Sequence, residues 1–402
     1  MTDVILEADK VRFCYPGAGE ALCGVSFSVR TGTKTALLGA NGAGKSTLLL
    51  MLNGMIHPSS GEIRFHGRPL AYSRGELREL RRRVGFVYQD PDRQILAPTV
   101  WQDVAFGPVN LDYDDTKIRR VVKEALGQVG LAGFDRRAPH HLSGGEKKRV
   151  AIAGVLAMDP DILVLDEPTS SLDPAGAADV MELLDELNAQ GKTIIISTHD
   201  VELSHQWADD VILMSKGTVV SQGSPQDIFT RPELITTTNL RAPAIIEIYT
   251  ELFARKMLTG TRVPKSILQL VKCFEYSARH EKHPRDYGTI TVCNIDEIYP
   301  SAIHVWLTGH PSYRRGAMGT RAKDLAGQES IALDFAYGVI DKCILRALIG
   351  ESSLILTIKE MVPRIERRVA EYCAESGNAI PVIPLVVSDQ PRTASTGTDP
   401  VK

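Results

Sequence analysis

The stretch TKTALLGANGAGKSTLLLMLNGM, residues Thr33 to Met55, combines an apolar strand, a glycine-rich loop and an apolar helix. Within it, Gly39–Ser46 fits the pattern GxxxxGK[ST], which requires a strand before it and a helix after it. The glycines let the loop turn backbone N–H groups onto phosphates, Lys45 supplies a positive charge, and the Ser46 hydroxyl is a ligand for Mg²⁺. This stretch therefore predicts a nucleotide-binding α/β core, and an accidental glycine-rich turn is the weaker interpretation.

The composition of the 402 residues is that of a globular chain long enough for two or three domains. With 46 basic and 49 acidic residues the formal net charge is -3, so nucleic acid is not expected as a partner. The six cysteines form no CxxC pair, which favours a reducing compartment over a disulfide framework. The N-terminus lacks a basic region followed by an apolar one, so we expect no secretory signal, and no apolar run approaches the roughly 20 residues that span a bilayer. We therefore expect any membrane role to act through a partner.

The stretch ILVLDEP, residues 162–168, is an apolar strand that ends in two carboxylates. Such a strand delivers Asp166 to the edge of the sheet, where it can hold the hydration shell of a metal, and places Glu167 to orient or deprotonate an attacking water. An acidic pair after a strand is weak evidence alone, because it is about as often a charge at a helix N-terminus. Together with the glycine-rich loop it predicts a nucleotide-hydrolysing site.

Three single residues extend this prediction. Gln89 follows the strand VGFVY and His199 follows the strand TIIIST, and ligands of open α/β sheets bind at such strand ends. Tyr15 is an aromatic residue that could stack on adenine. The ordinary alternatives are a turn glutamine, a satisfied histidine and a core aromatic.

A second stretch, HHLSGGEKKRVAIAGVLA (His140–Ala157), also looks like a phosphate-binding loop that opens a helix. Ser143, Gly144 and Gly145 offer a hydroxyl and exposed backbone N–H groups at the helix start. Two such loops in one chain raise the question of why one nucleotide would need both.

In this order, the motifs resemble those of the ATP-binding cassette family, the cytoplasmic ATPase subunits of ABC transporters, over roughly residues 3 to 258. The resemblance implies an ABC-type P-loop nucleotide-binding domain, with a RecA-like core, an antiparallel β subdomain and a helical signature subdomain. It implies hydrolysis of ATP with Mg²⁺. It also implies a head-to-tail pair with a second ABC ATPase subunit, in which the LSGGE signature binds the γ-phosphate held by the other subunit.

The resemblance assigns a role to each matching residue. Asp173 is the expected contact between subunits, and Gln89 is expected to sense both the metal and the membrane partner. The expected catalytic residues are Glu167, His199, Lys45 and Gln89. The expected nucleotide-binding residues are Tyr15, Gly39, Asn41, Gly42, Gly44, Lys45, Ser46, Thr47, Ser143, Gly144, Gly145 and Asp173. The expected metal ligands are Ser46, Gln89 and Asp166.

A narrower resemblance is to the ATPase subunits of energy-coupling-factor importers, particularly the cobalt and nickel branch, and it rests on residues 89–111 and on the signature region. It implies an integral membrane T component, a substrate-capture component and a peripheral position on the cytoplasmic face of the cell membrane. Asp90, Asp92 and Gln94 are the candidate contacts with the T component. Glu146 departs from the family pattern, where glutamine is frequent.

Two other functions remain open at this point. The first is an ATPase of a vitamin-type importer of the same class, because a separate membrane protein selects the solute. The second is an ABC ATPase that clamps DNA or ribosomes without transport; the single cassette and the lack of a long heptad insert disfavour it. The pairing, homodimer or heterodimer, also stays open.

Composition predicts three segments: an ABC ATPase domain at 1–258, a smaller α/β domain at 262–385 and a disordered tail at 386–402. In the second domain TITVCNI, IHVWLTG, SLILTI and AIPVIPLVV are the strand-like stretches, with a long helix at 359–375. His280 and His283, near Cys273, Cys293, His304 and His310, suggest a metal sensor, although packing residues are the stronger interpretation. The basic stretch 310–324 suggests an anion-binding loop, with a solvated loop as the stronger interpretation.

Overall fold

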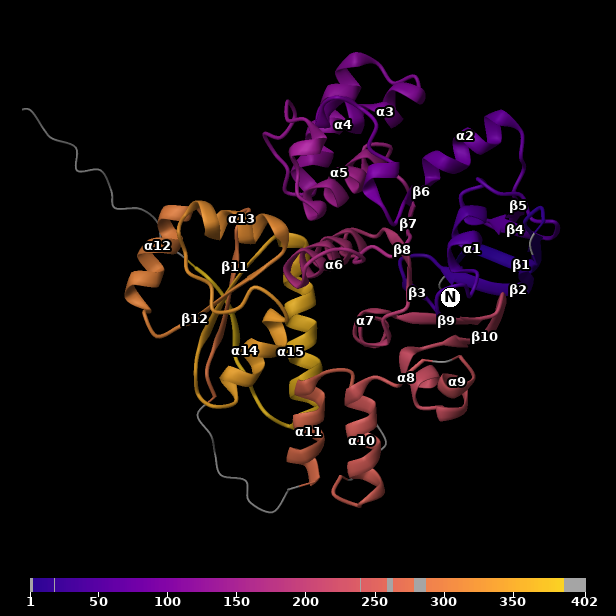
Figure 1. Ribbon diagram of the computed structural model, residues 1–402. Coiled ribbons are helices and arrows are strands. Elements are labelled where there is room, and N and C mark those ends of the chain that lie inside the picture. The colour runs from indigo at the N-terminus through magenta and orange to yellow at the C-terminus, as the bar shows by residue number, and fades with distance from the viewer. Residues whose placement is uncertain (1–2, 18, 239, 259–262, 278–286, 387–402) are drawn as a thin grey trace, which may run out of the picture. The chain divides into compact units, whose positions relative to one another are not determined.

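The computed structural model describes residues 3–17, 19–238, 240–258, 263–277 and 287–386. The chain divides into two compact units, each with its own sheet and helices (Figure 1). The first unit comprises Met1–Pro284 and Gly319–Asp324, and the second comprises Arg285–Met318 and Leu325–Lys402. Nearly all of the tail 386–402 lies outside the described residues, so its disorder stays a prediction.

The first unit continues past residue 258, where composition placed the end of the ATPase domain. Leu258 and Val263 are buried in the same hydrophobic core as the helices of this unit. The buried His205, on α7 (Val201–Trp207), places its Nε2 atom 3.1 Å from the backbone oxygen of Pro264. The break in composition therefore does not coincide with the division between the compact units.

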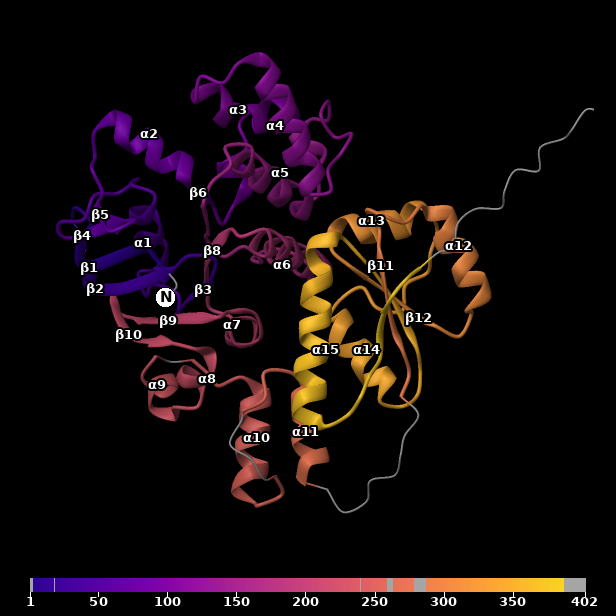
Figure 2. The same ribbon diagram turned by 180° about the vertical axis from the view of Figure 1, so that it is seen from behind.

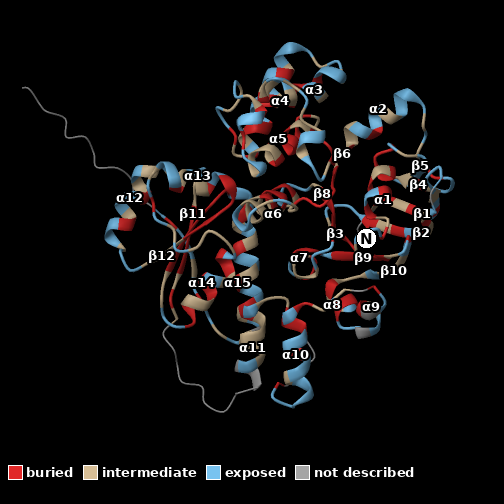
Figure 3. Cartoon of the chain, in the orientation of Figure 1, coloured by how far each residue is buried: buried red, intermediate tan, exposed pale blue. Residues whose placement is uncertain are grey.

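A six-stranded sheet forms the centre of the first unit, in the order β10-β9-β3-β8-β7-β6. Neighbouring strands are parallel except for β10, which pairs antiparallel with β9. Leu37 contributes to one hydrophobic core and Leu38 to another, so both faces of the sheet are covered, and Figure 3 shows its central strands as buried. The strands are β3 (Lys34–Leu38), β6 (Val84–Val87), β7 (Ile162–Leu165), β8 (Thr193–Thr198), β9 (Asp210–Ser215) and β10 (Thr218–Gly223).

An antiparallel sheet of order β2-β1-β4-β5 shares one of these cores with the central sheet. Its inward-facing residues, such as Leu6 and Val25, pack in the same cluster as Leu48 of α1 (Lys45–Leu52). This sheet therefore covers the helix that follows the glycine-rich loop. Its strands are β1 (Val4–Cys14), β2 (Glu20–Arg30), β4 (Ser60–Phe65) and β5 (Arg68–Pro69).

Three helices form a separate group in the first unit, α3 (Val100–Asn110), α4 (Asp115–Gln128) and α5 (Gly144–Leu156), and Figures 1 and 2 show them together from both sides. Their N-caps are Thr99, Asp114 and Ser143, each of which accepts a backbone N–H with its side chain. The other helices of this unit are α2 (Arg74–Arg83), η1 (Pro91–Arg93), η2 (Pro139–His141), α6 (Pro174–Ala189), α8 (Pro225–Phe229), α9 (Pro232–Thr237), α10 (Ala244–Ala254) and α11 (Ile267–Ser277).

The parallel core, the antiparallel sheet and the helical group confirm the predicted fold class of the first unit. Among the described residues, no helix is both long enough and apolar enough to cross a membrane.

The second unit contains a four-stranded parallel sheet of order β12-β13-β11-β14, which confirms a second, smaller α/β domain. The strands are β11 (Ile290–Asn294), β12 (Arg314–Met318), β13 (Ser353–Thr357) and β14 (Val382–Pro384). Helices and turns connect them: α12 (Pro300–Gly309), α13 (Thr320–Gln328), whose first residues group with the first unit, α14 (Val339–Ala347), η3 (Lys359–Met361) and α15 (Val362–Ser376).

Two local predictions for this unit are wrong. The stretch IHVWLTG lies in the helix α12, where Ile303 and Leu307, one turn apart, are buried while Val305 between them is exposed. The basic stretch after residue 310 is not a loop throughout, because Arg314–Met318 forms the strand β12. A Cβ at Gly316 would lie 2.4 Å from Val339 Cγ1, so this strand needs glycine where α14 packs on it.

Candidate active site

The glycine-rich loop connects the end of β3 to the first residue of α1, Lys45. Gly44 has a φ of 97°, and a Cβ there would lie 2.8 Å from the backbone oxygen of Ala21, so only glycine fits this turn. A Cβ at Gly39 would lie 2.6 Å from the backbone oxygen of Met214. These close approaches explain the glycines at both positions and leave the loop backbone open toward a ligand.

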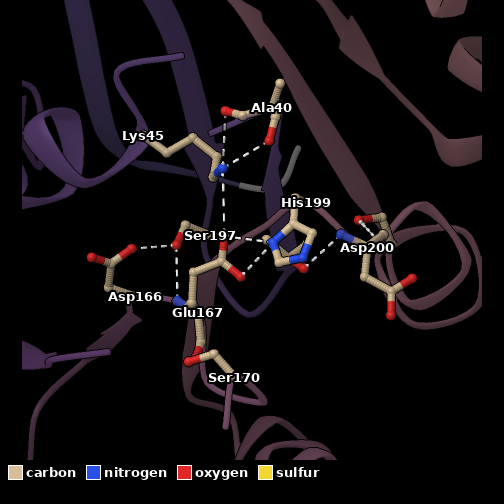
Figure 4. Close-up of polar contacts among 11 residues, drawn as sticks. Ala40, Lys45, Asp166, Glu167, Ser170, Ser197, His199 and Asp200 are labelled. Carbon is tan, nitrogen blue, oxygen red and sulfur yellow. Dashed lines mark hydrogen bonds and ion pairs between the residues drawn. The ribbon is translucent and has the colours of Figure 1, made fainter. Parts of the chain in front are cut away.

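Glu167 sits just beyond β7 in a backbone conformation that side chains rarely adopt, with a φ of 44°. Such a conformation costs on the order of 1–3 kcal/mol and persists where the surroundings enforce it. Ser197 Oγ accepts the Glu167 backbone N–H at 2.9 Å and donates to Asp166 Oδ1 at 2.5 Å. Ser170 Oγ donates to the Glu167 backbone oxygen at 2.9 Å. The neighbouring hydroxyls therefore hold the backbone of Glu167 in this conformation (Figure 4).

Lys45, Glu167 and His199 form one polar cluster (Figure 4). Lys45 Nζ donates to the backbone oxygens of Gly39 at 2.7 Å and Ala40 at 3.3 Å, and it lies 3.4 Å from Glu167 Oε1. His199 Nδ1 lies 3.0 Å from Glu167 Oε2. Lys45 and Glu167 are buried, whereas His199 is exposed, so the buried cation and anion neutralise each other beside a solvent-facing imidazole.

A cavity of about 510 Å³ adjoins this cluster. It brings together predicted residues from four separate segments, since the loop, Gln89, Glu167 and His199 all line it. The strand-end argument for Gln89 and His199 therefore placed them correctly beside the loop. The lining residues are Glu20, Ala21, Asn41, Gly42, Ala43, Gly44, Lys45, Ser46, Thr47, Gln89, Glu167, His199, Lys216 and Gly217.

The other predicted site residues do not line this cavity. Asp166 is buried, and the backbone oxygen of Gly39 accepts a hydrogen bond from Lys45 Nζ. The hydroxyl of Tyr15 lies 3.2 Å from Thr47 Oγ1, which holds its partly exposed ring near the start of α1. The remaining four are Ser143, Gly144, Gly145 and Asp173.

The signature residues begin α5 through a reciprocal cap. Ser143 Oγ accepts the backbone N–H of Glu146 at 3.2 Å, and Glu146 Oε2 accepts the backbone N–H of Ser143 at 2.7 Å. Asp173 caps α6 in a similar way, with Oδ1 accepting the backbone N–H of Gly176 at 2.7 Å. The Glu146 carboxylate therefore already accepts a hydrogen bond from one of the N–H groups at the start of the signature helix.

Sequence reasoning missed several residues at the site. Ser197 bonds both Asp166 and Glu167 from the neighbouring strand β8, and its only sequence signal is a hydroxyl near the end of an apolar strand. Glu20 and Lys216 line the cavity from β2 and from the turn between β9 and β10. Their place depends on how the two sheets pack, which no local pattern indicates.

The candidate metal sensor is not supported by the part of the second unit that the structure describes. His280 and His283 lie outside the described residues. Within those ranges, no three histidine, cysteine or acidic side chains gather closely enough to hold a metal ion. Cys293 is buried, and this burial raises the pKa of its thiol to about 12, while His310 stacks on Trp306. These side chains serve packing, in agreement with the stronger interpretation.

Comparison with known proteins identifies the family. The family described as ABC transporter matches residues 22–170. The energy-coupling factor transporter ATP-binding protein EcfA2 of Methanospirillum hungatei is 50% identical over 389 residues, which cover 96% of this chain and 98% of that protein. The chain belongs to the ATP-binding proteins of energy-coupling factor transporters. This ATP-binding protein is also 50% identical to EcfA of Methanocaldococcus jannaschii, over 61% of this chain and 88% of that protein.

Solved structures agree with this family. The structure of cbiO1 from Clostridium perfringens, part of the ABC transporter complex cbiONQ, is 43% identical with a TM-score of 0.54, over 62% of this chain and 99% of that chain. A dimeric ATP-binding cassette in a post-hydrolysis state, bound to ADP and Pi, is 28% identical with a TM-score of 0.50, over 55% and 99%. The energy-coupling factor ATP-binding protein described here is therefore an ATP-hydrolysing transporter subunit.

Proposed function

We propose that this chain is the ATPase of an energy-coupling factor importer for cobalt or nickel ions. The observation that carries its ATPase role is the single cavity lined by Lys45, Glu167, His199 and Gln89. Support for the metal ion as solute comes from the resemblance of residues 89–111 to the cobalt and nickel branch. A vitamin-type importer is the alternative that the uptake experiment below distinguishes.

In the proposed assembly, a second subunit supplies the signature residues that the cavity of one chain lacks. Ser143, Gly144 and Gly145 do not line the cavity of their own chain, so they are available to a second ATPase subunit in a head-to-tail pair. Each ATP would then lie between the glycine-rich loop of one subunit and the signature of the other. An integral membrane T component and a substrate-capture component complete the importer, with the ATPases at the cytoplasmic face of the membrane.

In the proposed mechanism Glu167 takes a proton from the attacking water. Ser197 and Ser170 hold the backbone of Glu167, and His199 Nδ1 lies 3.0 Å from its Oε2, so the carboxylate is already positioned when the water arrives. Lys45, which lies 3.4 Å from Glu167 Oε1, turns to the phosphates when ATP binds and thereby frees the carboxylate to act as a base. His199 then faces the charge that develops on the transferred phosphoryl group.

The residues expected to hold Mg²⁺ fit a hard cation. Ser46 and Gln89 line the cavity, and Asp166 is buried next to Glu167 in the sequence, so hydroxyl, amide and carboxylate oxygens make up the donor set. When bound there, Mg²⁺ would neutralise negative charge on the phosphate oxygens. Ser197 bonds one oxygen of Asp166 and so fixes how this carboxylate is presented.

The segment after Gln89 carries the proposed membrane-partner surface. Three large apolar side chains of this segment, Leu96, Phe106 and Val109, are exposed by 78%, 64% and 55%. Asp92 lies on the same segment and pairs with a lysine of α5. Gln94, a predicted contact, is instead bonded within the chain through both polar atoms, so the apolar residues are the better candidates.

Uptake of radiolabelled Co²⁺ and Ni²⁺ by cells that carry the chain with its membrane components tests the proposal. Phe106→Asp is expected to reduce uptake at least about tenfold while ATP turnover of the purified chain stays unchanged, because Phe106 is exposed and does not line the cavity. Phe253→Asp, a matched change at another exposed phenylalanine, is expected to have no effect. The assignment of the solute would be contradicted if cells with an inactive ATPase still took up Co²⁺ and Ni²⁺ normally but no longer took up a vitamin.

We expect the negative charge of Glu146 to repel the γ-phosphate of the ATP that the partner subunit holds. Its carboxylate lies 2.7 Å from the Ser143 backbone nitrogen at the start of the signature helix, where an anion would bind. Glu146→Gln keeps an oxygen acceptor for the cap and removes the charge, so the ATP concentration for half-maximal dimerisation should fall about two- to fivefold. Light scattering during an ATP titration measures this.

The matched control for Glu146 is Glu76→Gln. Glu76 occupies the same helical position in α2, where Ser73 caps the helix and bonds it. This control should leave the ATP dependence of dimerisation unchanged. An equal shift in both variants, or none in Glu146→Gln, would show that the carboxylate does not compete with phosphate.

A further inference from the structure

Lys148 is a buried cation that the proposed mechanism does not use. It lies one turn inside α5, and only 1% of its surface is exposed. Its Nζ atom donates to the backbone oxygens of Tyr88 at 3.0 Å and of Gln89 at 2.6 Å. A buried ammonium without partners would be strongly destabilising, so these two carbonyls account for its position.

The burial of the charged Lys148 side chain costs free energy. Burial lowers the pKa of Lys148 to about 8, and the negative charges of Asp166 and Asp90 oppose that shift. A buried apolar side chain of similar length would avoid the cost of removing a charge from water. The lysine therefore offers something that an apolar residue cannot, which is a directed bond to two backbone oxygens beside the cavity.

A second side chain joins the same two segments. Gln94 accepts the backbone N–H of Tyr88 at 3.1 Å and donates to the backbone oxygen of Ala151 in α5 at 3.2 Å. On the surface, Lys147 pairs with Asp92 at 2.7 Å. The segment 88–94 is thus bonded to the first two turns of α5 by three side chains, and Lys148 is the most buried of them.

We propose that Lys148 is a positioning residue that locks Gln89 and the segment after it to the signature helix. A displacement of residues 89–94 by a membrane partner would then move Ser143 with it, because both are held to the same two turns of α5. Lys148 does not line the nucleotide cavity and so acts through Gln89 and α5 only. This inference rests on the proposed function, in which Ser143 completes the site of a second subunit.

Lys148→Met tests this inference, because methionine keeps the length and flexibility of the side chain and removes its donors. The affinity for the first ATP, measured with a fluorescent ATP analogue on the monomer, should stay within about twofold, since the glycine-rich loop is not touched. Turnover of the full chain should fall at least about tenfold, because Lys148→Met misplaces both Gln89 and the signature, on which hydrolysis depends. Lys148→Gln, which can still donate to one carbonyl, should recover part of this loss.

Lys34→Met is the matched control. Lys34 is also mostly buried in the first unit, where it pairs with Asp185 at 2.9 Å away from the cavity. Its loss should lower the melting temperature without separating ATP affinity from turnover. If Lys148→Met does not fold, the split between affinity and turnover in Lys148→Gln decides.

Two results would overturn the inference. One is turnover within about twofold of wild type in Lys148→Met or, where only Lys148→Gln folds, in that variant. The other is an equal loss of affinity and turnover that simply follows the melting temperature, as expected of a structural lysine. A wild-type chain without ATP turnover would instead contradict the proposed function, so the two failures are distinguishable.

Discussion

Glu167→Gln is expected to bind ATP, to form stable dimers and to reduce turnover at least about a hundredfold. The amide cannot accept the proton of the attacking water, while the backbone contact with Ser197 that positions this residue is retained. The change also removes the ion pair with Lys45, so ATP affinity should not fall. Phosphate release measures turnover, and size-exclusion chromatography with ATP measures the dimer.

A control at a distant glutamate separates this effect from a general loss of charge. Glu202 accepts a backbone N–H from Ala244 and does not line the cavity, so Glu202→Gln should hydrolyse ATP as wild type does. Near wild-type turnover in Glu167→Gln would mean that another group acts as the base, and the assignment of Glu167 would be wrong.

Ser143→Arg is expected to reduce turnover at least about a hundredfold, while a monomer still binds its first ATP normally. The arginine would fill the start of the signature helix, but Ser143 does not line the cavity of its own chain. Lys45→Ala should instead lose ATP affinity in the monomer, because Lys45 lines that cavity. Equilibrium titration of each monomer with a fluorescent ATP analogue separates the two outcomes.

Ser143→Arg and Lys45→Ala serve as controls for each other, because both are expected to lose hydrolysis and only the second is expected to lose affinity for the first ATP. Loss of first-ATP affinity in Ser143→Arg as severe as in Lys45→Ala would contradict a site shared between subunits. It would place the signature and the glycine-rich loop on the same nucleotide within one chain.

Most of the candidate site could be predicted from the sequence because its parts are local patterns with a required context. The glycine-rich loop between a strand and a helix placed Lys45 and Ser46, and the apolar strand at residues 162–165 placed the Glu167 that follows it. Gln89 and His199 followed from a topological rule, since parallel strands present their carboxyl ends at one edge of the sheet.

The features that escaped prediction depend on contacts between distant segments. Ser197 acts on Asp166 from a neighbouring strand, and Lys148 reaches two carbonyls that are 60 and 59 residues away in sequence. In the second unit, the alternating apolar residues of IHVWLTG fit a strand as well as a helix in so short a stretch, and only the burial of Ile303 and Leu307 distinguishes them.

Mixing the two inactive variants tests the shared site most directly. In a head-to-tail pair of a Lys45→Ala chain with a Ser143→Arg chain, one site carries both defects and the other site carries neither. Equal mixing should therefore restore ATP turnover to about a quarter of the wild-type rate, since half of the dimers are mixed and half of their sites are intact. Turnover that remains at the sum of the two residual rates, at every mixing ratio, would contradict a site built from two subunits.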